Sequence, residues 1–565
     1  MSRINITGSS GAVLATEPKL LDPNTATDSR NAKPGRGDLR PWRTPLGVYT
    51  VPSGTKTIYR MGRKVPSDTQ YWLTWNTVVH AIHGFISGDT TERTFYTGDG
   101  PPKQTNNIIG VAGPGPYPTA SRSLGVPAPV SKLAVAPLTP GVADQEEIRY
   151  YTYTYVTEWG DESAPAPVSD PVTGKTDATY TLSAIASPPA GDYGINRIRF
   201  YRTQYGSNGE SEFFFLREEI SSITSTTDDG RALGEVLPTD GWLTPPTDLR
   251  NLTAMWNGMA AAIVDSDGSV RYCLAYKPYA WPIAQETLTP NAQAVGLGVF
   301  GQRLLIVTTG KPVLVAGSSP DSLDEQPLEF AQSCVSSQSV VSMGHGVAWA
   351  SPEGLAYFGD GGAKLVTAGI LTPDQWAAMR PDTIIGALYE GAYFGSYLDA
   401  DDVRRGFFID CISPAGIFFL DEGYDAAFYD DSQDVLYVLK GTSIQKWDAG
   451  ASLMTASRRT KEFVGYERSY TAARVEADVY PVTLIVDAKE VSPALVADRL
   501  LERPDLFTSP AAGVLRHTRA VTNREPFRLP GGFTSRIYQF TVQTGVGGLQ
   551  WAAIATSISE LVESE

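Results

Sequence analysis

The chain has 565 residues and a formal net charge of -16, and its 42% hydrophobic content excludes wholesale disorder. Its 54 glycines and 40 prolines are too many for a helical bundle and suit short strands joined by tight turns. The acidic balance argues against a protein that grips phosphates through clustered Lys and Arg, but it is compatible with a surface that DNA passes without sticking.

Residues 1–45 carry scattered turn formers and few periodic apolar positions. Such a segment cannot bury enough surface alone, so we predict an extended N-terminal arm that lies against another body, such as a neighbouring copy. If so, its deletion would leave the melting of the folded monomer unchanged. Residues 46–144 begin with alternating aromatic strands and end in a stretch dense in Pro and Gly, which predicts the first part of a β-propeller followed by a linker.

Residues 145–248 have the pattern of a separate small sandwich. The run Ile148–Val156 alternates aromatic and polar positions, a turn follows at Glu158–Glu162, and further short strands are predicted near residues 195–202 and 212–217. Several alternating strands within about 100 residues are typical of an immunoglobulin-like or fibronectin-like module.

Residues 249–455 contain recurring glycine-led β segments with Gly/Asp turns, which favour the remainder of a β-propeller. One helix is predicted there, with Thr372 as N-cap, Pro373 at the first helical position and Gln375 completing a capping box. Residues 456–565 are predicted to form a further C-terminal β domain. The predicted fold class is therefore all-β.

No catalytic, cofactor-binding or metal-binding residue is predicted. Cys273, Cys334 and Cys411 are odd in number and far apart, which indicates buried, reduced thiols rather than disulfides or a zinc site. His80 and His83 follow a strand-like run and are interpreted as satisfied polar residues rather than metal ligands. The other histidines are His345 and His517.

Four short motifs come close to known signatures without matching them. Gly174-Lys175-Thr176 lacks the glycine that a phosphate loop needs at position 169, and Asp265–Gly268 lacks the remaining ligands of a calcium loop. Ser351–Gly354 has the wrong spacing for the Asp-box turn of sialidase propellers, and Trp447-Asp448 is a single copy of a propeller dipeptide. We interpret the first two as turns and give the other two no functional weight.

No uninterrupted apolar stretch comes close to the roughly 20 residues that span a bilayer, and the N-terminus lacks the apolar core of a signal peptide. We therefore expect a soluble protein made in a cytoplasm.

A series of phrases, in order over about residues 95–560, resembles the tail hub or nozzle proteins of short-tailed bacteriophages, also described as tail tubular or packaged-DNA stabilisation proteins. The phrases are Phe95–Lys103, Leu124–Pro129, Tyr151–Ser163, Ile198–Arg202, Tyr279–Pro282, Cys334–Ser339, Ala350–Leu355, Leu371–Trp376, Ala477–Val482 and Pro526–Pro530. The chain departs from the family pattern at Cys273–Pro278, where a Ser-Glu-Pro run is expected.

The resemblance implies a β-propeller interrupted by the inserted sandwich and assembled as a ring, a hexamer, around a DNA exit channel. It implies as partners further copies of the chain, the portal and adaptor ring proteins, and tail fibre, spike or needle proteins. Viral DNA would pass through the lumen without sequence-specific binding. The implied location is the virion tail, assembled in the host cytoplasm, and the family has no catalytic residues to transfer.

Two other functions stay open at this point. The chain could be a receptor-binding or glycan-binding tail protein, because its 11 Trp and 27 Tyr could stack on sugars. Aromatic residues of β proteins, however, more often fill cores and interfaces. A glycosidase on a propeller is the third reading, because pairs of carboxylates abound in so acidic a chain.

Overall fold

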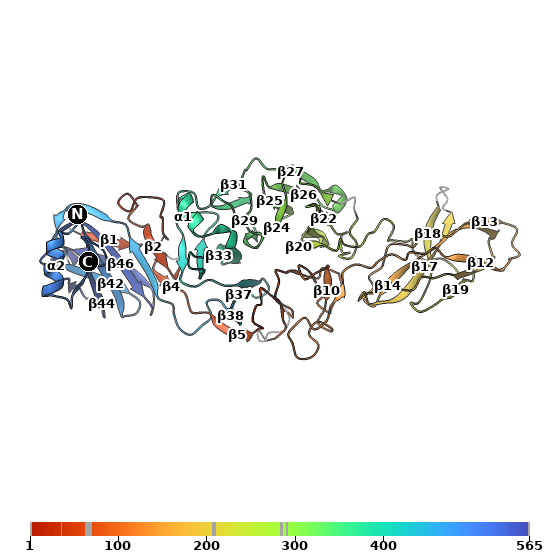
Figure 1. Cartoon of the computed structure of the whole chain (residues 1–565), viewed down its shortest axis with the longest axis horizontal. Coiled ribbons are helices and arrows are strands. Elements are labelled where there is room, and N and C mark those ends of the chain that lie inside the picture. Colours follow the sequence, from red (N-terminus) through yellow and green to blue (C-terminus); the bar gives the residue numbers. More distant parts are fainter. Residues whose placement is uncertain are drawn as a thin grey trace. The chain divides into compact units, whose positions relative to one another are not determined.

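The computed structural model describes residues 3–8, 10–35, 37–62, 70–205, 211–282, 286–289 and 292–562. The chain divides into two compact units: unit 1 comprises residues 1–70 and 330–565, and unit 2 comprises residues 71–329. Strands dominate both units (Figure 1), which confirms the predicted all-β class. The described helices are short: α1 (Pro373–Ala378), α2 (Pro493–Glu502), α3 (Ser559–Val562) and the 3-10 turns Trp256–Gly258, Pro320–Ser322, Ser337–Ser339 and Pro381–Thr383. None of these described helices is long and apolar enough to cross a membrane.

Unit 2 contains three four-stranded sheets in which consecutive strands pair antiparallel, the arrangement of propeller blades. The first blade is β8 (His80–His83), β9 (Thr94–Thr97), β10 (Lys103–Thr105) and β11 (Arg122–Ser123), preceded in sequence by β7 (Trp72–Trp75). The second blade is β20 (Leu249–Ala254), β21 (Ala260–Val264), β22 (Val270–Tyr272) and β23 (Glu286–Thr287). The third is β24 (Ala294–Phe300), β25 (Arg303–Thr308), β26 (Val313–Ala316) and β27 (Asp324–Pro327).

Apolar inner strands explain why these segments fold as blades. All five residues of β21 are buried, and Ile263 packs in one cluster with Leu304 and Ile306 of β25. Each fully buried aliphatic side chain of this size contributes about 1.5–3 kcal/mol to the free energy of folding. The inner strands therefore hold the second and third blades together.

A β-sandwich is inserted in the sequence between the first and second blades. Its strands are β12 (Ala134–Thr139), β13 (Glu146–Arg149), β14 (Tyr151–Thr157), β15 (Val172–Lys175), β16 (Thr179–Ser183), β17 (Ile195–Tyr205), β18 (Ser211–Ile220) and β19 (Ser225–Asp228). They form the sheets β12-β16-β19, β13-β15 and β14-β17-β18. Tyr151, Tyr153 and Tyr155 of β14 point into the core, as the alternation predicted.

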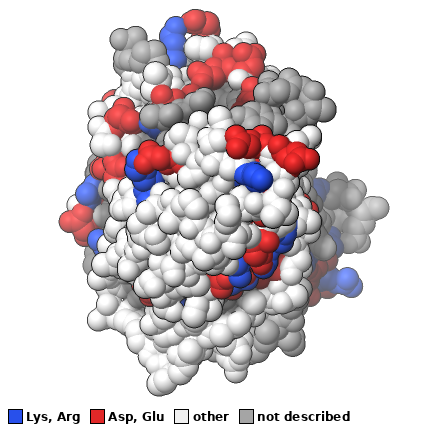
Figure 2. Space-filling view, turned by 90° about the vertical axis from the view of Figure 1, so that its right-hand side faces the viewer, with Lys and Arg blue, Asp and Glu red and all other residues white. Residues whose placement is uncertain are grey.

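The sandwich begins earlier than predicted. β12 lies in the segment that was assigned to the linker, but it pairs with β16 at the end of its sheet. Pro137 explains the error, because proline argues against a central strand yet is tolerated at a sheet edge. The sandwich also exposes Leu138 and Val142 to solvent. Figure 2, which looks from the side on which the sandwich is drawn in Figure 1, shows a broad area without charged side chains.

Unit 1 contains three more four-stranded antiparallel runs of blade type. They are β28 (Val341–Ser342), β29 (Gly346–Ala350), β30 (Leu355–Gly359) and β31 (Gly362–Leu365); β32 (Ile385–Tyr389), β33 (Ala392–Leu398), β34 (Arg404–Ile409) and β35 (Phe418–Leu420); and β36 (Ala426–Asp430), β37 (Val435–Lys440) and β38 (Ser443–Lys446) with β5 (Leu46–Thr50). The last sheet is completed by β5 from the N-terminal part of the chain, which pairs with β38. The chain is thus an all-β protein of propeller type that carries an inserted sandwich.

The C-terminal part of unit 1 forms two further sheets. One has the order β1-β47-β41-β45, and the other joins β32–β35 through β2 to β39, β46, β42, β44 and β43, with β40 beside β46. The bounds are β1 (Arg3–Thr7), β2 (Ala26–Arg30), β39 (Ala456–Thr460), β40 (Phe463–Arg468), β41 (Ala472–Ala477), β42 (Val482–Lys489), β43 (Phe507–Thr508), β44 (Leu515–Val521), β45 (Phe527–Arg528), β46 (Ser535–Thr544) and β47 (Leu549–Ala555). Unit 1 also contains β3 (Ala32–Lys33), β4 (Arg40–Pro41) and β6 (Thr57–Arg60).

The predicted N-terminal arm, residues 1–45, is corrected by this topology. β1 pairs with β47 along its whole length, β2 pairs with β39, and Trp42 is fully buried in the core of unit 1. The segment buries its surface against strands from the far end of its own chain, so it does not need a neighbouring copy to be ordered.

Candidate functional site

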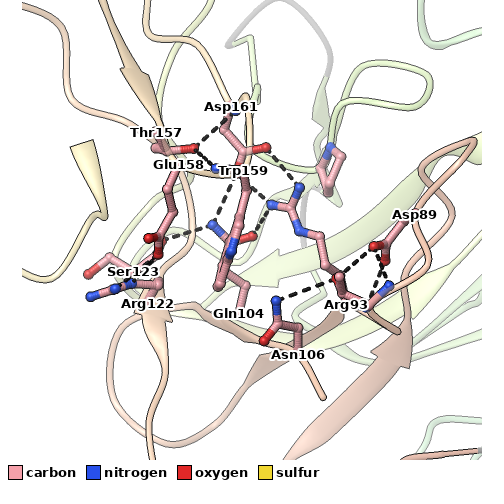
Figure 3. A network of polar contacts seen from close by, with 12 residues as sticks. Asp89, Arg93, Gln104, Asn106, Arg122, Ser123, Thr157, Glu158, Trp159 and Asp161 are labelled. Atoms are coloured by element: carbon pink, nitrogen blue, oxygen red, sulfur yellow. Dashed lines mark hydrogen bonds and ion pairs between the residues drawn. The ribbon is translucent and has the colours of Figure 1, made fainter. Parts of the chain in front are cut away.

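A buried polar network in unit 2 joins the sandwich to the first blade (Figure 3). At its centre is the guanidinium of Arg93, which donates hydrogen bonds to Asp161 Oδ1 at 3.0 Å and to Asp161 Oδ2 at 2.5 Å. Arg93 also donates to the side-chain oxygen of Gln104, whose amide nitrogen donates to Asp161 Oδ2 at 3.1 Å. Arg93, Gln104 and Asp161 are all buried, and both terminal nitrogens of the Arg93 guanidinium donate within the network.

Each member of the network has a fixed position in the fold. Arg93 lies directly before β9, Gln104 lies in β10, and Asp161 lies in the turn after β14. The turn is closed by two hydrogen bonds with Thr157: its N–H donates to the Asp161 carbonyl at 2.9 Å, and its Oγ1 accepts from the Asp161 N–H at 3.0 Å. Gly160 completes the turn with a φ of 83°, a conformation that favours glycine.

Two aromatic rings lie close to the Arg93 guanidinium. Its central carbon lies 5.0 Å from the centroid of the Trp159 ring and 5.5 Å from that of Phe95. Cation–π contacts are stronger when the cation is shielded from water, so both rings favour the charged guanidinium in this position.

The rim of the network is exposed. Arg122 donates to Glu158 at 2.9 Å and also pairs with Asp192, while Asp89 accepts from the backbone N–H groups of Thr91 and Arg93 at 2.8 Å. Partial burial acts to raise the pKa of Asp89, but the hydrogen bonds from Thr91 and Arg93 outweigh it and lower that pKa. The rim therefore keeps a carboxylate ionised next to the loop that carries Arg93.

The residue after Asp161 anchors a second cluster. Glu162 accepts hydrogen bonds from Thr154 and Arg199, both at 2.7 Å, and from the Tyr201 hydroxyl at 2.5 Å. Burial and the adjacent carboxylate raise the pKa of Tyr201, because both disfavour a second negative charge. Tyr201 thus stays a hydrogen-bond donor.

Both buried carboxylates are neutralised by an arginine and saturated with donors. Such an arrangement suits rigid attachment of one element to another, because its members have fixed partners and geometry. We therefore assign the network to positioning the sandwich on the blade.

The cysteines of the chain are buried, and two of its histidines lie within hydrogen-bond distance of an oxygen. Cys273, Cys334 and Cys411 are buried, unpaired thiols, and burial raises the pKa of each to about 12. His345 Nδ1 is 2.7 Å from the Tyr357 hydroxyl, and His517 Nδ1 is 2.9 Å from the Leu506 carbonyl. Within the described ranges, no group of three or more His, Cys, Asp or Glu side chains could hold a metal ion.

The near-match motifs occupy ordinary structural positions. Asp265–Gly268 is the turn between β21 and β22, where Asp267 accepts from Ser269, and Ser351–Gly354 is the turn between β29 and β30. Gly174 and Lys175 differ from the prediction, because they end β15 and pair with β13 rather than lying in a turn. Asp448 is the second residue after β38 and accepts a hydrogen bond from Lys33 Nζ at 2.8 Å.

Lys33 also lines a cavity of about 560 Å³ in unit 1. Its ammonium group pairs with Glu390 at 2.7 Å and with Asp448 and lies over the Trp42 ring at 4.5 Å, and Arg40 on the same wall pairs with Asp38 at 2.9 Å. A charged ligand would therefore have to break existing ion pairs to bind Lys33 or Arg40.

No family model and no curated protein matches the chain. Among solved structures, it is similar to a streptogramin B lyase, with 10% identity, 56% of this chain and 97% of that chain covered, and a TM-score of 0.23. It is also similar to virginiamycin B lyase from Staphylococcus aureus, with 9% identity, 66% and 99% covered and a TM-score of 0.23. A third is the WD40 domain of Toxoplasma gondii coronin, with 11% identity, 71% and 89% covered and a TM-score of 0.24. At such TM-scores these likenesses carry no argument about function.

Proposed function

We propose that the chain is a structural virion protein, the subunit of a ring-shaped tail nozzle or hub of a short-tailed bacteriophage. In this proposal the ring extends the portal channel, retains packaged DNA and conducts it during ejection. The observation that carries the proposal is the ordered series of phrases over residues 95–560 that resembles this family.

The location of two of these phrases supports the proposal. Phe95–Lys103 spans most of β9 and the start of β10, and Tyr151–Ser163 spans β14 and the turn that holds Asp161. The phrases therefore meet at the network around Arg93, where the inserted sandwich is attached. In this proposal the network would hold the sandwich in a fixed place in the ring.

The charge of the chain is compatible with a conduit. With a net charge of -16, a lumen lined by carboxylates would repel phosphates, so DNA would pass without adhering, and counter-ions would screen the rest. General solubility explains the same charge equally well, so the charge is secondary support.

The glycan-binding alternative requires aromatic rings that sugars can reach. Eight of the 11 Trp are buried and the other three are half-buried. The buried ones are Trp42, Trp72, Trp75, Trp242, Trp281, Trp349, Trp376 and Trp447. The tryptophans therefore offer little accessible ring surface, whereas Tyr466 is 84% exposed. A glycan array separates the two functions, because tight and selective binding to one glycan would support the alternative.

Electron microscopy of the purified chain mixed with its portal and adaptor complex tests the proposal. We expect ring-shaped density of this chain coaxial with the portal channel. A chain that never joins the portal complex, or that binds away from the channel axis, would defeat the proposal.

A further inference from the structure

Unit 1 contains a surface cleft of about 420 Å³ whose charge is opposite to that of the whole chain. It is lined by β1, by Lys19 and Pro23 of the following segment, by β40 and by β46. Five of its lining residues are cations: Arg3, Lys19, Lys461, Arg468 and Arg536. The single lining carboxylate, Glu462, already forms an ion pair with Lys489. In a chain of net charge -16, this cluster is a local reversal of sign.

Two of these five cations, Lys461 and Arg536, form no ion pair with a residue that the structure describes. Arg536 is exposed and has no ion pair with any residue that the structure describes. Lys461 donates its hydrogen bond to the Leu21 carbonyl, a neutral group, and Lys19 is 3.6 Å from Glu490 in an exposed pair. Exposed pairs of this kind contribute little and exchange readily for another anion.

Aromatic and apolar side chains accompany the cations. Phe463, Tyr470 and Tyr538 line the cleft, and the rings of Tyr470 and Tyr538 meet edge to face at 4.8 Å. On β40, Tyr466 is 84% exposed and Val464 is 58% exposed. Tyrosine and arginine side by side are the residue types that dominate binding energy at protein interfaces.

Two strands that line the cleft have an unpaired edge. β1 is the terminal strand of its sheet, and β40 pairs only with β46 among the described strands. Free strand edges offer backbone donors and acceptors to an added extended segment.

We propose that this cleft binds an extended acidic peptide segment of a partner protein. Carboxylates of the segment pair with Arg536 and Lys19, its apolar side chains pack on Tyr466, and its backbone bonds to an unpaired strand edge. A peptide fits better than nucleic acid, because DNA longer than the cleft would extend beyond a Debye length of about 8–10 Å onto a predominantly acidic protein. This inference does not depend on the proposed tail function.

Fluorescence anisotropy with a labelled peptide of alternating Glu and Val tests the proposal on the full chain. We expect binding that the double variant Lys19→Glu, Arg536→Glu weakens at least about tenfold, because two attractive contacts become repulsive. The matched control is Arg231→Glu with Lys311→Glu, which makes the same charge change at two exposed, ion-paired residues of unit 2 and should leave the affinity within about twofold. Tyr466→Ser should also weaken binding, whereas Leu501→Ser, at an equally exposed position, should not.

Three results would overturn the proposal. They are no binding of the Glu-Val peptide, equal loss in both charge-reversal variants, and tighter binding of single-stranded DNA or inorganic phosphate than of the peptide. Circular dichroism of each variant shows that it is folded, since all the substituted residues are exposed.

Discussion

Arg93 is the residue on which attachment of the sandwich depends most. Its guanidinium is buried with Asp161, so Arg93→Ala leaves a buried carboxylate without its counter-charge. Breaking a buried ion pair in this way lowers the free energy of unfolding by about 3–5 kcal/mol. We expect hydrogen exchange of the amides in residues 157–162 to accelerate at least about a hundredfold.

Arg122→Ala is the matched control in the same network. Its pairs with Glu158 and Asp192 are exposed, where ion pairs are worth about 0–1 kcal/mol, so exchange should change less than about fivefold. Equal effects of the two substitutions would contradict the assigned role of Arg93.

The three cysteines allow a direct test of burial. Cys273, Cys334 and Cys411 have pKa values raised to about 12 by burial, which leaves almost no thiolate at neutral pH. We expect an aromatic disulfide reagent to react with none of the thiols in the native chain and with all three in guanidinium chloride. Rapid reaction of any native thiol would show that its surroundings are open to solvent.

His517 links the stability of unit 1 to pH. Burial lowers its pKa below the ordinary value of 6.5, and its Nε2 has no hydrogen-bond partner among the described residues. The unfolded chain therefore binds the proton first as the pH falls, and the contribution of His517 is fully present above pH 6.5 and decreases below it. His517→Gln should reduce the loss of melting temperature between pH 7 and pH 5. An unchanged pH dependence would contradict this.

At the scale of elements, Arg458 holds the N-terminal strand in place. Its guanidinium donates to the carbonyls of Asn24 at 2.6 Å, Thr7 at 3.3 Å and Gly8, and burial lowers its pKa to about 10. Arg458→Met leaves these carbonyl acceptors without their charged donor, which lowers the free energy of unfolding by about 1.5–3 kcal/mol.

We expect hydrogen exchange in residues 3–7 to accelerate about tenfold or more in this variant. Deleting residues 1–8 should lower the melting temperature of unit 1, because β47 then loses a neighbour. A deletion variant with unchanged melting would instead agree with the separate arm that the sequence suggested.

Local signals explain which elements could be predicted. Thr372 caps α1 by accepting from the Gln375 N–H at 3.2 Å, and the reciprocal bond is present, as the capping box predicted. α2 was missed although Ser492 and Pro493 carry the same kind of start signal. The prediction for residues 456–565 was a β domain and included no helix.

Non-local pairing explains what the sequence could not provide. β1 pairs with β47 from the opposite end of the chain, and Arg93 meets Asp161 across 68 positions. The two members of each pair lie far apart in the sequence, and no local sequence pattern of one member points to the other. A short window of sequence therefore cannot identify either pair. The turn at Glu158–Glu162 was predicted, but its role in the network depends on this distant arginine.

At the scale of the whole molecule, we propose that the protein acts through its shape and through contacts between copies. The second and third blades pack through buried apolar strands, and the buried Arg93 links the sandwich to the first blade. The proposed ring adds contacts that a single chain does not contain.

Native mass spectrometry of the chain with its portal complex tests the central proposal most directly. The account predicts a closed assembly containing a fixed multiple of the 60.9 kDa chain, six copies according to the family resemblance. A chain that stays at 60.9 kDa in the presence of the portal complex would contradict it.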